Sequence, residues 1–434
     1  DYTSRANMVA VVTNGTAVLG LGDIGPLAAK PVMEGKAVLF KKFAGIDVFD
    51  IEIDEKDPDK LIDIIASLEP TFGGINLEDI KSPECFYIEE KLKNRMKVPV
   101  FHDDQHGTAI ICGAAVINAM HVVGKDLSEV KLVTSGAGAA GMACLDLLLE
   151  LGMQIENIIV SDSEGVLYEG REDLESDRKL SYAKGVKQQS VTEALIGADI
   201  FLGVSVGGVL KPEMIKPMAR DPLIMALANP TPEIMPDLAL EVRPDAIIAT
   251  GRSDFPNQVN NVLCFPYIFR GALDAGASCI NEAMKTACVH ALANLARMEV
   301  SEVSSKAYGG KEMKFGRAYL IPQPFDPRIL IHVAPAVAKA AMDSGVATRQ
   351  IEDMAEYENQ LNEFVYQSGL LMRPVFDAAR KDLKRVVLAE GEDDRVLRAV
   401  QVVNNDQLAI PVLIGRPDVI NQRIKKMGLN LEIG

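Results

Sequence analysis

The sequence predicts an α/β protein with a small N-terminal α/β domain, a Rossmann-type domain built on a doubly wound parallel sheet, and a C-terminal fragment of a third α/β domain. Three observations predict this class. The 434 residues suffice for two or three domains of ordinary size. Short apolar segments alternate with helical ones between residues 131 and 250, as in a parallel sheet covered on both faces. A glycine-rich turn lies between the first of these strands and its helix.

The pattern changes twice, which predicts three domains: residues 1–104, 105–348 and 349–434. The first mixes short strands and helices, and the second holds the regular alternation. The third begins with a charged amphipathic helix, a plausible linker, and contains only two strand candidates. Because two strands cannot enclose a core of their own, we expect this last part to be the truncated start of a domain.

The N-terminal domain alternates apolar strands with amphipathic helices. The run MVAVVT from Met8 is typical of a buried strand and ends at the turn signal Asn14-Gly15. The run IDVFDIEI from Ile46 alternates as a half-buried strand does. Another short apolar run covers residues 18–21. The expected elements are strands 8–13, 46–53 and 72–75 and helices 35–43, 59–68 and 83–95.

The second and third domains follow the same logic. An apolar, small-residue helix at 109–123 precedes the sheet, and helices follow it. The expected strands are 131–134, 158–160, 200–204, 223–227 and 246–250, and the expected helices are 141–151, 190–196, 212–219, 268–274, 281–297 and 329–343. In the third domain we expect helices 350–364 and 395–403 and strands 384–389 and 409–414.

The composition is that of a folded, soluble protein, with 48% hydrophobic and 24% charged residues. A net charge of −16 without a long basic stripe argues against nucleic-acid and anionic-membrane partners. No run reaches the roughly 20 uncharged apolar residues of a membrane helix. The six cysteines form no CxxC pair and indicate core thiols of a reducing cytosol, so we predict a cytoplasmic protein. The chain begins without Met, and we expect its natural N-terminus to lie upstream.

A glycine-rich motif predicts a dinucleotide site. It follows a strand, opens a helix, and has Asp162 at the end of the next strand, where an acid can bind the adenosine ribose. Such glycines let backbone N–H groups approach a pyrophosphate, although they can also form a purely structural turn. An acid favours NAD and a nearby cation such as Arg171 favours NADP, so the cofactor stays open. The motif is Gly136-Ala137-Gly138-Ala139-Ala140-Gly141.

Two pairs of acids end short strands ahead of this motif: Glu78-Asp79 and Asp103-Asp104. Carboxylate oxygens suit Mg²⁺ or Mn²⁺. The alternative is that these acids only cap the helices after them. Lys36 precedes an apolar run; near a divalent cation its pKa would fall, and it could act as a general base, although most lysines are solvated.

Amides and histidines complete the candidates. Asn229 ends the expected strand 223–227, and Asn261 follows a Pro-containing loop; both could hold carboxylates or a nicotinamide carboxamide, or serve only in turns. His102 and His106 have a metal-like spacing if helical, but the acids nearby are better ligands, so we assign the histidines supporting or structural roles.

Several short motifs occur in order along residues 1–348, and with the Gly136 turn they resemble the malic enzymes: Gly20-Leu21-Gly22-Asp23-Ile24-Gly25, Glu34-Gly35-Lys36, Asn76-Leu77-Glu78-Asp79, Asp103-Asp104, Ala226 to Pro230 and Asn260-Asn261. The segment AEGEDDRVLRA from Ala389 resembles the start of a phosphotransacetylase domain. The pairing is similar to the bacterial hybrid malic enzymes, with the second module truncated.

The resemblance implies oxidative decarboxylation of L-malate to pyruvate and CO₂ with reduction of NADP or, less in keeping with the hybrids, NAD. It implies Mn²⁺ or Mg²⁺ on Glu78, Asp79 and Asp104. Lys36 would be the general base, with Asp103 paired to it. The remaining implied roles are substrate carboxylate and nicotinamide binding by Asn229 and Asn261. It further implies a homo-oligomer, a dimer or larger, with acetyl-CoA as an allosteric effector acting through the second module.

Two departures from the family pattern stand out. The family's catalytic tyrosine belongs to a motif expected upstream of Asp1, and Tyr2 does not lie in that motif. The arginine of larger eukaryotic malic enzymes is replaced within residues 16–19, so malate's second carboxylate needs another cation, Arg252 or one from a partner subunit. Two other functions therefore remain open: a metal-independent NAD dehydrogenase, and a catalytically silent nucleotide-sensing module.

Overall fold

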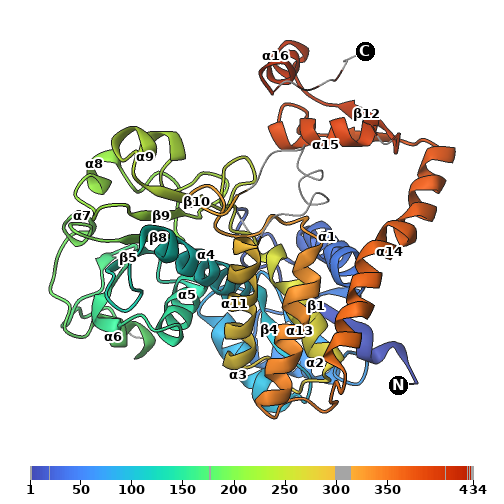
Figure 1. Cartoon of the computed structure of the whole chain (residues 1–434), viewed down its shortest axis with the longest axis horizontal. Coiled ribbons are helices and arrows are strands. Elements are labelled where there is room, and N and C mark those ends of the chain that lie inside the picture. The colour runs from blue at the N-terminus through green and yellow to red at the C-terminus, as the bar shows by residue number, and fades with distance from the viewer. Residues whose placement is uncertain are drawn as a thin grey trace. The chain divides into compact units, whose positions relative to one another are not determined.

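The computed structural model confirms the α/β class and describes residues 2–18, 20–174, 177–298, 314–405, 407–427, 429 and 431. The chain forms two compact units, Asp1–Leu361 and Asn362–Gly434 (Figure 1). The first contains two parallel sheets and the helices around them. This division does not test the domain boundaries predicted at 104 and 348, because both lie inside the first unit. They therefore stay predictions.

The N-terminal sheet has four parallel strands in the order β2-β1-β3-β4. Because the strands are parallel, their carboxyl ends share one edge, and the residues that follow β3 and β4 are the two acid pairs. A fully apolar core lies between the sheet and helices α2 and α3. The elements are β1 (Met8–Thr13), α1 (Pro26–Ala44), β2 (Asp47–Glu52), α2 (Pro58–Ser67), β3 (Gly74–Leu77), α3 (Glu84–Arg95) and β4 (Val100–His102).

The second sheet has six strands in the order β10-β9-β8-β5-β6-β7. All neighbours are parallel except the edge strand β7, which pairs antiparallel with β6 and was not predicted. Strand order reverses next to β5, which is where ligands bind in such sheets. The strands are β5 (Leu132–Ser135), β6 (Ile158–Asp162), β7 (Gly165–Val166), β8 (Ile200–Gly203), β9 (Leu223–Ala226) and β10 (Ile247–Thr250).

Helices flank this sheet and then return to the N-terminal region. Helix α10 packs against α1 and α13, and α11 packs against α4 and α13; Figure 1 shows α11 beside α13. The helices are α4 (Thr108–Val123), α5 (Ala139–Glu150), α6 (Asp177–Ala183), α7 (Val191–Ala194), α8 (Pro212–Ile215), α9 (Pro236–Val242), α10 (Phe265–Asp274), α11 (Glu282–Arg297) and α13 (Arg328–Asp343), with short helical turns η1 (Ser4–Asn7), η3 (Ile155–Asn157) and η4 (Asn261–Leu263).

The second unit is a small α/β piece, as predicted. Two parallel strands pair with each other, and Leu397, Ile420 and Ile424 form a small buried cluster. The long helix α14 leads from the first unit into the second. The elements are α14 (Met354–Lys381), β11 (Arg385–Leu388), α15 (Asp394–Asn405), β12 (Ile410–Leu413) and α16 (Pro417–Met427).

Several sequence-based assignments differ from the structure. Helix α1 starts at Pro26 instead of residue 35, because Pro26 occupies the first helical turn, where no N–H is needed, and Pro31 is tolerated inside the helix. Helix α14 continues to Lys381, well beyond residue 364. The segment after β4 forms a π-helical turn, η2 (Asp103–Gly107), which runs directly into α4. The run at 18–21 forms a turn closed by a bridge between Val18 and Gly22.

The helical stretch Asp103–Val123 is long and apolar enough to cross a membrane by length and composition. The sequence reading had excluded such a run. In the structure 67% of that window is buried inside the fold, as in the core helix of a globular domain. The evidence for a membrane span is therefore weak.

Candidate active site

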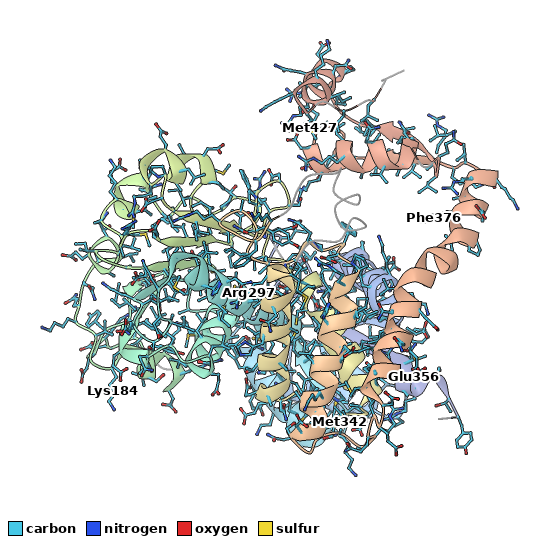
Figure 2. All side chains as sticks on the ribbon, viewed as in Figure 1. Lys184, Arg297, Met342, Glu356, Phe376 and Met427 are labelled. Carbon is cyan, nitrogen blue, oxygen red and sulfur yellow. The ribbon has the colours of Figure 1, made fainter. Side chains whose placement is uncertain are left out.

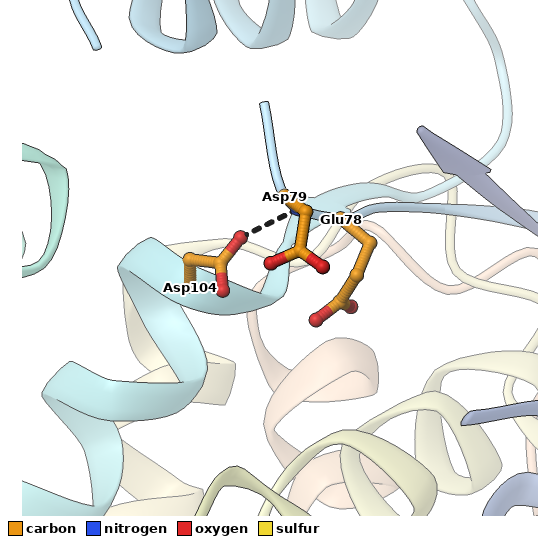
Figure 3. A group of neighbouring side chains, drawn as sticks. All are labelled: Glu78, Asp79 and Asp104. Atoms are coloured by element: carbon orange, nitrogen blue, oxygen red, sulfur yellow. Dashed lines mark hydrogen bonds between the residues drawn. The ribbon is translucent and has the colours of Figure 1, made fainter. Parts of the chain in front are cut away.

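Three carboxylates meet at the carboxyl edge of the N-terminal sheet. Glu78 and Asp79 follow β3, and Asp104 lies in the π-helical turn η2 after β4. One oxygen of each lies within 4.8 Å of the others, and Glu78 and Asp79 are buried. Figure 3 shows the three side chains gathered at this edge, with the Asp79 backbone N–H donating to Asp104 Oδ2 over 2.8 Å. Asp79 holds φ at 53°, a conformation that is costly for a non-glycine residue and typical of functional sites.

The crowding of these acids favours a positive charge among them. Burial and the neighbouring carboxylates raise the pKa of Asp79 to about 8. Burial also raises the pKa of Glu78 well above its usual range, even though Lys36 opposes this shift. Carboxylates packed this closely favour a divalent cation among them, and oxygen donors suit Mn²⁺ or Mg²⁺. The residues present therefore fit the metal that the sequence predicts.

Lys36 reaches the same cluster from the middle of α1. Its Nζ lies 2.6 Å from Asp103 Oδ2 and 2.9 Å from Glu78 Oε1, and it packs 4.2 Å from the centre of the Phe265 ring. Burial alone lowers the pKa of Lys36, but the two carboxylates outweigh burial and hold that pKa above its ordinary value. The sequence-based expectation was a lowered pKa for Lys36 beside a divalent cation. The lysine and its two carboxylates alone give the opposite shift.

Asp103 is fully buried and tied to two elements. Besides Lys36, Asn261 donates to its Oδ2 over 3.2 Å, while Thr108 Oγ1 donates to Asn261 Oδ1 over 3.0 Å. A Cβ at Gly107 would come within 2.1 Å of Asp103 Oδ1, so this turn needs glycine there. The structure therefore brings Asn261 to the lysine–aspartate pair.

A cavity of about 1390 Å³ lies over the glycine-rich turn. Its lining includes Gly136, Ala137, Gly138, Asp162 and Lys179. The turn follows β5 and ends in α5, which begins at Ala139, so Ala139, Ala140 and Gly141 form the first helical turn. Backbone N–H groups at a helix start suit a phosphate, and the site fits a dinucleotide.

Asp162 is not a free acid in this cavity. Arg171 donates to its Oδ1 over 2.8 Å and Lys179 to its Oδ2 over 3.1 Å. Burial alone raises the pKa of Asp162, but these two cations outweigh burial and lower that pKa. Arg178 also lines the cavity. The sequence reading missed Arg178 and Lys179, because nothing in their charged segment shows which side chains face the ligand.

Asn229 lies beside the Gly20 motif. It follows β9, is exposed, and stands near Gly20, whose added Cβ would lie 3.8 Å from the Asn229 carbonyl oxygen. Arg252, the candidate for malate's second carboxylate, pairs with Asp254 at 2.7 Å and donates to the Pro230 carbonyl over 3.2 Å. The Gly20 motif and the loops after β9 and β10 thus lie close together.

The His106 ring contacts a buried glutamate that was not among the sequence-based candidates, while the His102 ring lies beside Asp104. His106 Nε2 lies 2.9 Å from Glu89 Oε1, whereas His102 Nδ1 is 3.6 Å from Asp104 Oδ2, beyond a hydrogen bond. Glu89 belongs to the buried face of α3, together with Cys85, Ile88 and Leu92. A glutamate within an apolar helical stripe was the available signal.

We expect Gly141→Ala to disrupt the glycine-rich turn. The new Cβ would stand 2.1 Å from the Gly136 carbonyl oxygen, a clash that costs about 1–3 kcal/mol by overpacking. Thermal unfolding and dinucleotide titration should show lower stability and weaker binding. Gly138→Ala is the matched control for stability, since no heavy atom lies within 4 Å of its added Cβ. Equal stability of the two variants would contradict this packing.

Family models match most of the first unit and part of the second. Malic enzyme, N-terminal domain, matches residues 1–93; Malic enzyme, NAD binding domain, matches 105–306; Phosphate acetyl/butaryl transferase matches 370–434. The crystal structure of malic enzyme from Pyrococcus horikoshii Ot3 is 42% identical with a TM-score of 0.76, covering 86% of this chain and 85% of that one. The chain belongs to the malic enzyme family.

Two bacterial relatives match the whole chain or nearly all of it. The NADP-dependent malic enzyme of Salmonella typhimurium is 64% identical over 100% of this chain and 57% of its own length. The NAD-dependent malic enzyme of Rhizobium meliloti is 62% identical over 99% of this chain and 56% of its own length. The chain thus spans little more than half the length of these two relatives. The predicted resemblance to malic enzymes with a phosphotransacetylase-like part is confirmed.

Proposed function

We propose that this malic enzyme family member oxidatively decarboxylates L-malate to pyruvate and CO₂ while reducing NADP, or less effectively NAD. The observation that carries the proposal is Lys36, held between Asp103 and Glu78 beside a three-carboxylate cluster. Removal of the proton from malate's hydroxyl group, which neighbours a carboxylate, requires a base beside a site that can hold a cation. The glycine-rich cavity in the same unit supports the nucleotide part of the reaction.

The chain's own residues account for the proton steps. Lys36 takes the proton from the C2 hydroxyl and shares it with Asp103, 2.6 Å away. After CO₂ leaves, the same pair returns a proton to C3, so the reaction gains or loses no proton. Asn261, oriented by Thr108, is placed to hold a substrate carboxylate or the nicotinamide amide. Asn229 and Arg252 are proposed to bind the substrate's other end.

Glu78, Asp79 and Asp104 would hold the divalent cation. When bound, the cation supplies Lewis-acid stabilisation of negative charge on the substrate oxygen, and bound NAD(P) supplies the hydride acceptor. Engagement of Glu78 with the cation would remove one of the two charges that raise the Lys36 pKa, leaving Asp103 as the main partner.

We further propose that the protein works in the cytoplasm as a homo-oligomer. The match of residues 370–434 to an acyltransferase family supports acetyl-CoA as an effector that acts through this part of the protein.

The deciding measurement is malate-dependent formation of NADPH and NADH, with and without Mn²⁺, on protein expressed from its whole gene. We expect Mn²⁺-dependent NADPH formation. Failure to reduce either nucleotide in any combination would overturn the proposal, and binding of NADP without turnover would favour a nucleotide-sensing module. Turnover retained by Glu78→Ala would instead favour a metal-independent dehydrogenase.

Lys179 carries the expected NADP preference. Its ammonium lies in the cavity lining and pairs with Asp162, the residue placed to meet the adenosine ribose. Lys179→Met removes a charge-assisted contact to a 2′-phosphate, worth about 1.5–3 kcal/mol, so the KM for NADP should rise roughly 10- to 100-fold while that for NAD stays unchanged. Lys184→Met, on the exposed end after α6 (Figure 2), is the control. A parallel rise for both nucleotides would contradict this role.

A further inference from the structure

A buried carboxylate on α3 ties together the two ends of the turn that carries Asp103 and Asp104. Glu89 Oε1 accepts the backbone N–H of His102, the residue directly before the turn, over 3.1 Å. Both oxygens of Glu89 lie 2.9 Å from Nε2 of His106, near the other end of the turn. Glu89 is only 5% exposed, so these contacts form away from solvent.

The chemistry of the network fixes the tautomer of His106. A carboxylate only accepts, so Nε2 of His106 carries the hydrogen, and Nδ1 is left to accept from the Lys285 ammonium 3.4 Å away. Lys285 is itself held by Glu282 at 2.6 Å. The donors and acceptors therefore run from Lys285 through His106 to Glu89, and the Lys93 ammonium also donates to Glu89 Oε1 over 2.8 Å.

The turn needs such a support because its backbone is irregular. A π-helical turn lacks the ordinary helical hydrogen bonds, and η2 has no side-chain cap at its start. Its two acids have different partners: Asp103 faces Lys36, and Asp104 faces Asp79. A change of the backbone between the His102 N–H and the His106 ring would change both contacts together.

We propose that Glu89 is a positioning residue that sets the separation of Asp104 from Glu78 and Asp79 at the candidate metal centre, a role that rests on the function proposed above. Glu89 contacts neither the metal-fitting oxygens nor Lys36. It acts by holding His102 and His106 at both ends of η2. Supporting partners of this kind typically change metal affinity by about 10- to 100-fold.

Glu89→Gln tests this role with almost no change of shape. The Gln side chain can accept from the His102 N–H, but its NH₂ group then faces the Nε2–H of His106. His106 cannot resolve this clash by changing tautomer, because Nδ1–H would then face the Lys285 ammonium. We expect Mn²⁺ binding, measured by electron paramagnetic resonance of free Mn²⁺, to weaken about 10- to 100-fold, with NADP binding unchanged.

A second substitution separates this specific effect from general damage. Adding Lys285→Met to Glu89→Gln removes the ammonium, allows His106 to change tautomer, and should restore a large part of the Mn²⁺ affinity. General destabilisation would instead be additive. His106→Phe keeps a ring against Phe101 but removes the hydrogen bond from the His106 ring to Glu89. This variant should also bind Mn²⁺ more weakly. Glu84→Gln, a similar change on the same helix at a residue paired with Lys81, is the control.

The outcomes distinguish this role from the proposed function. If the unmodified protein binds no Mn²⁺, the metal centre itself is overturned, and the role of Glu89 with it. If the unmodified protein binds Mn²⁺ and Glu89→Gln binds it equally well, only the positioning role is overturned. Equal loss in Glu89→Gln and in the double variant would also overturn it, since relief at Lys285 is the specific consequence of the network.

Discussion

Lys36→Met is expected to lower kcat for malate oxidation about 100- to 10,000-fold, the usual contribution of a general base. Methionine keeps the apolar stem against Phe265 and removes the ammonium. Asp103 and Glu78 then lose their shared cation, so the metal-free protein should also be less stable by about 3–5 kcal/mol. Steady-state kinetics at saturating Mn²⁺ and thermal unfolding measure the two effects.

Metal binding separates a catalytic lysine from a structural one. Removal of a positive charge next to the acids should leave Mn²⁺ affinity unchanged or higher, while turnover falls. Lys41→Met is the matched control on the same helix, because Lys41 is an exposed residue that pairs with Asp47. Retention of kcat by Lys36→Met would exclude this lysine as the base.

Asp104→Asn should nearly abolish both Mn²⁺ binding and Mn²⁺-dependent turnover. The asparagine has the same shape and its oxygen can still accept from the Asp79 N–H, but one of the three negative charges at the centre is lost. Lewis-acid stabilisation is worth several kcal/mol, so kcat/KM should fall roughly 1000-fold. Isothermal titration with Mn²⁺ and kinetics with malate provide the measurements.

The control for this variant is Asp63→Asn, an exposed aspartate on α2 that pairs with Arg95. In addition, Mn²⁺ should stabilise the unmodified protein. At a Mn²⁺ concentration of 100 times its Kd, the free energy of unfolding should rise by up to about 2.7 kcal/mol, and the unfolding midpoint should rise with it. Asp104→Asn should show no such stabilisation, whereas Asp63→Asn should keep both the stabilisation and the binding. Full malate turnover by this variant would show that the acid cluster is not a catalytic metal centre.

Several strands could be predicted from the residues within and beside them. Strands such as Met8–Thr13 and Ile200–Gly203 are short apolar runs bounded by turn residues, and their burial follows from that pattern. The start of α1 was predicted too late, at residue 35, whereas the helix begins at Pro26 and tolerates Pro31 in its interior. The π-helical turn at Asp103–Gly107 has no local signature and was not predicted.

The fold class, the family resemblance and the acid pairs could be predicted from the order of the residues, since parallel strands must place the residues after them at one edge of the sheet. Only the tertiary structure decided which groups meet. Lys36, on a helix far away in the sequence, contacts Asp103; Lys179 contacts Asp162; and Glu89 supports the turn between β4 and α4. The physical reason is that strand order and helix packing set these distances, whereas residue spacing along the chain sets only local geometry.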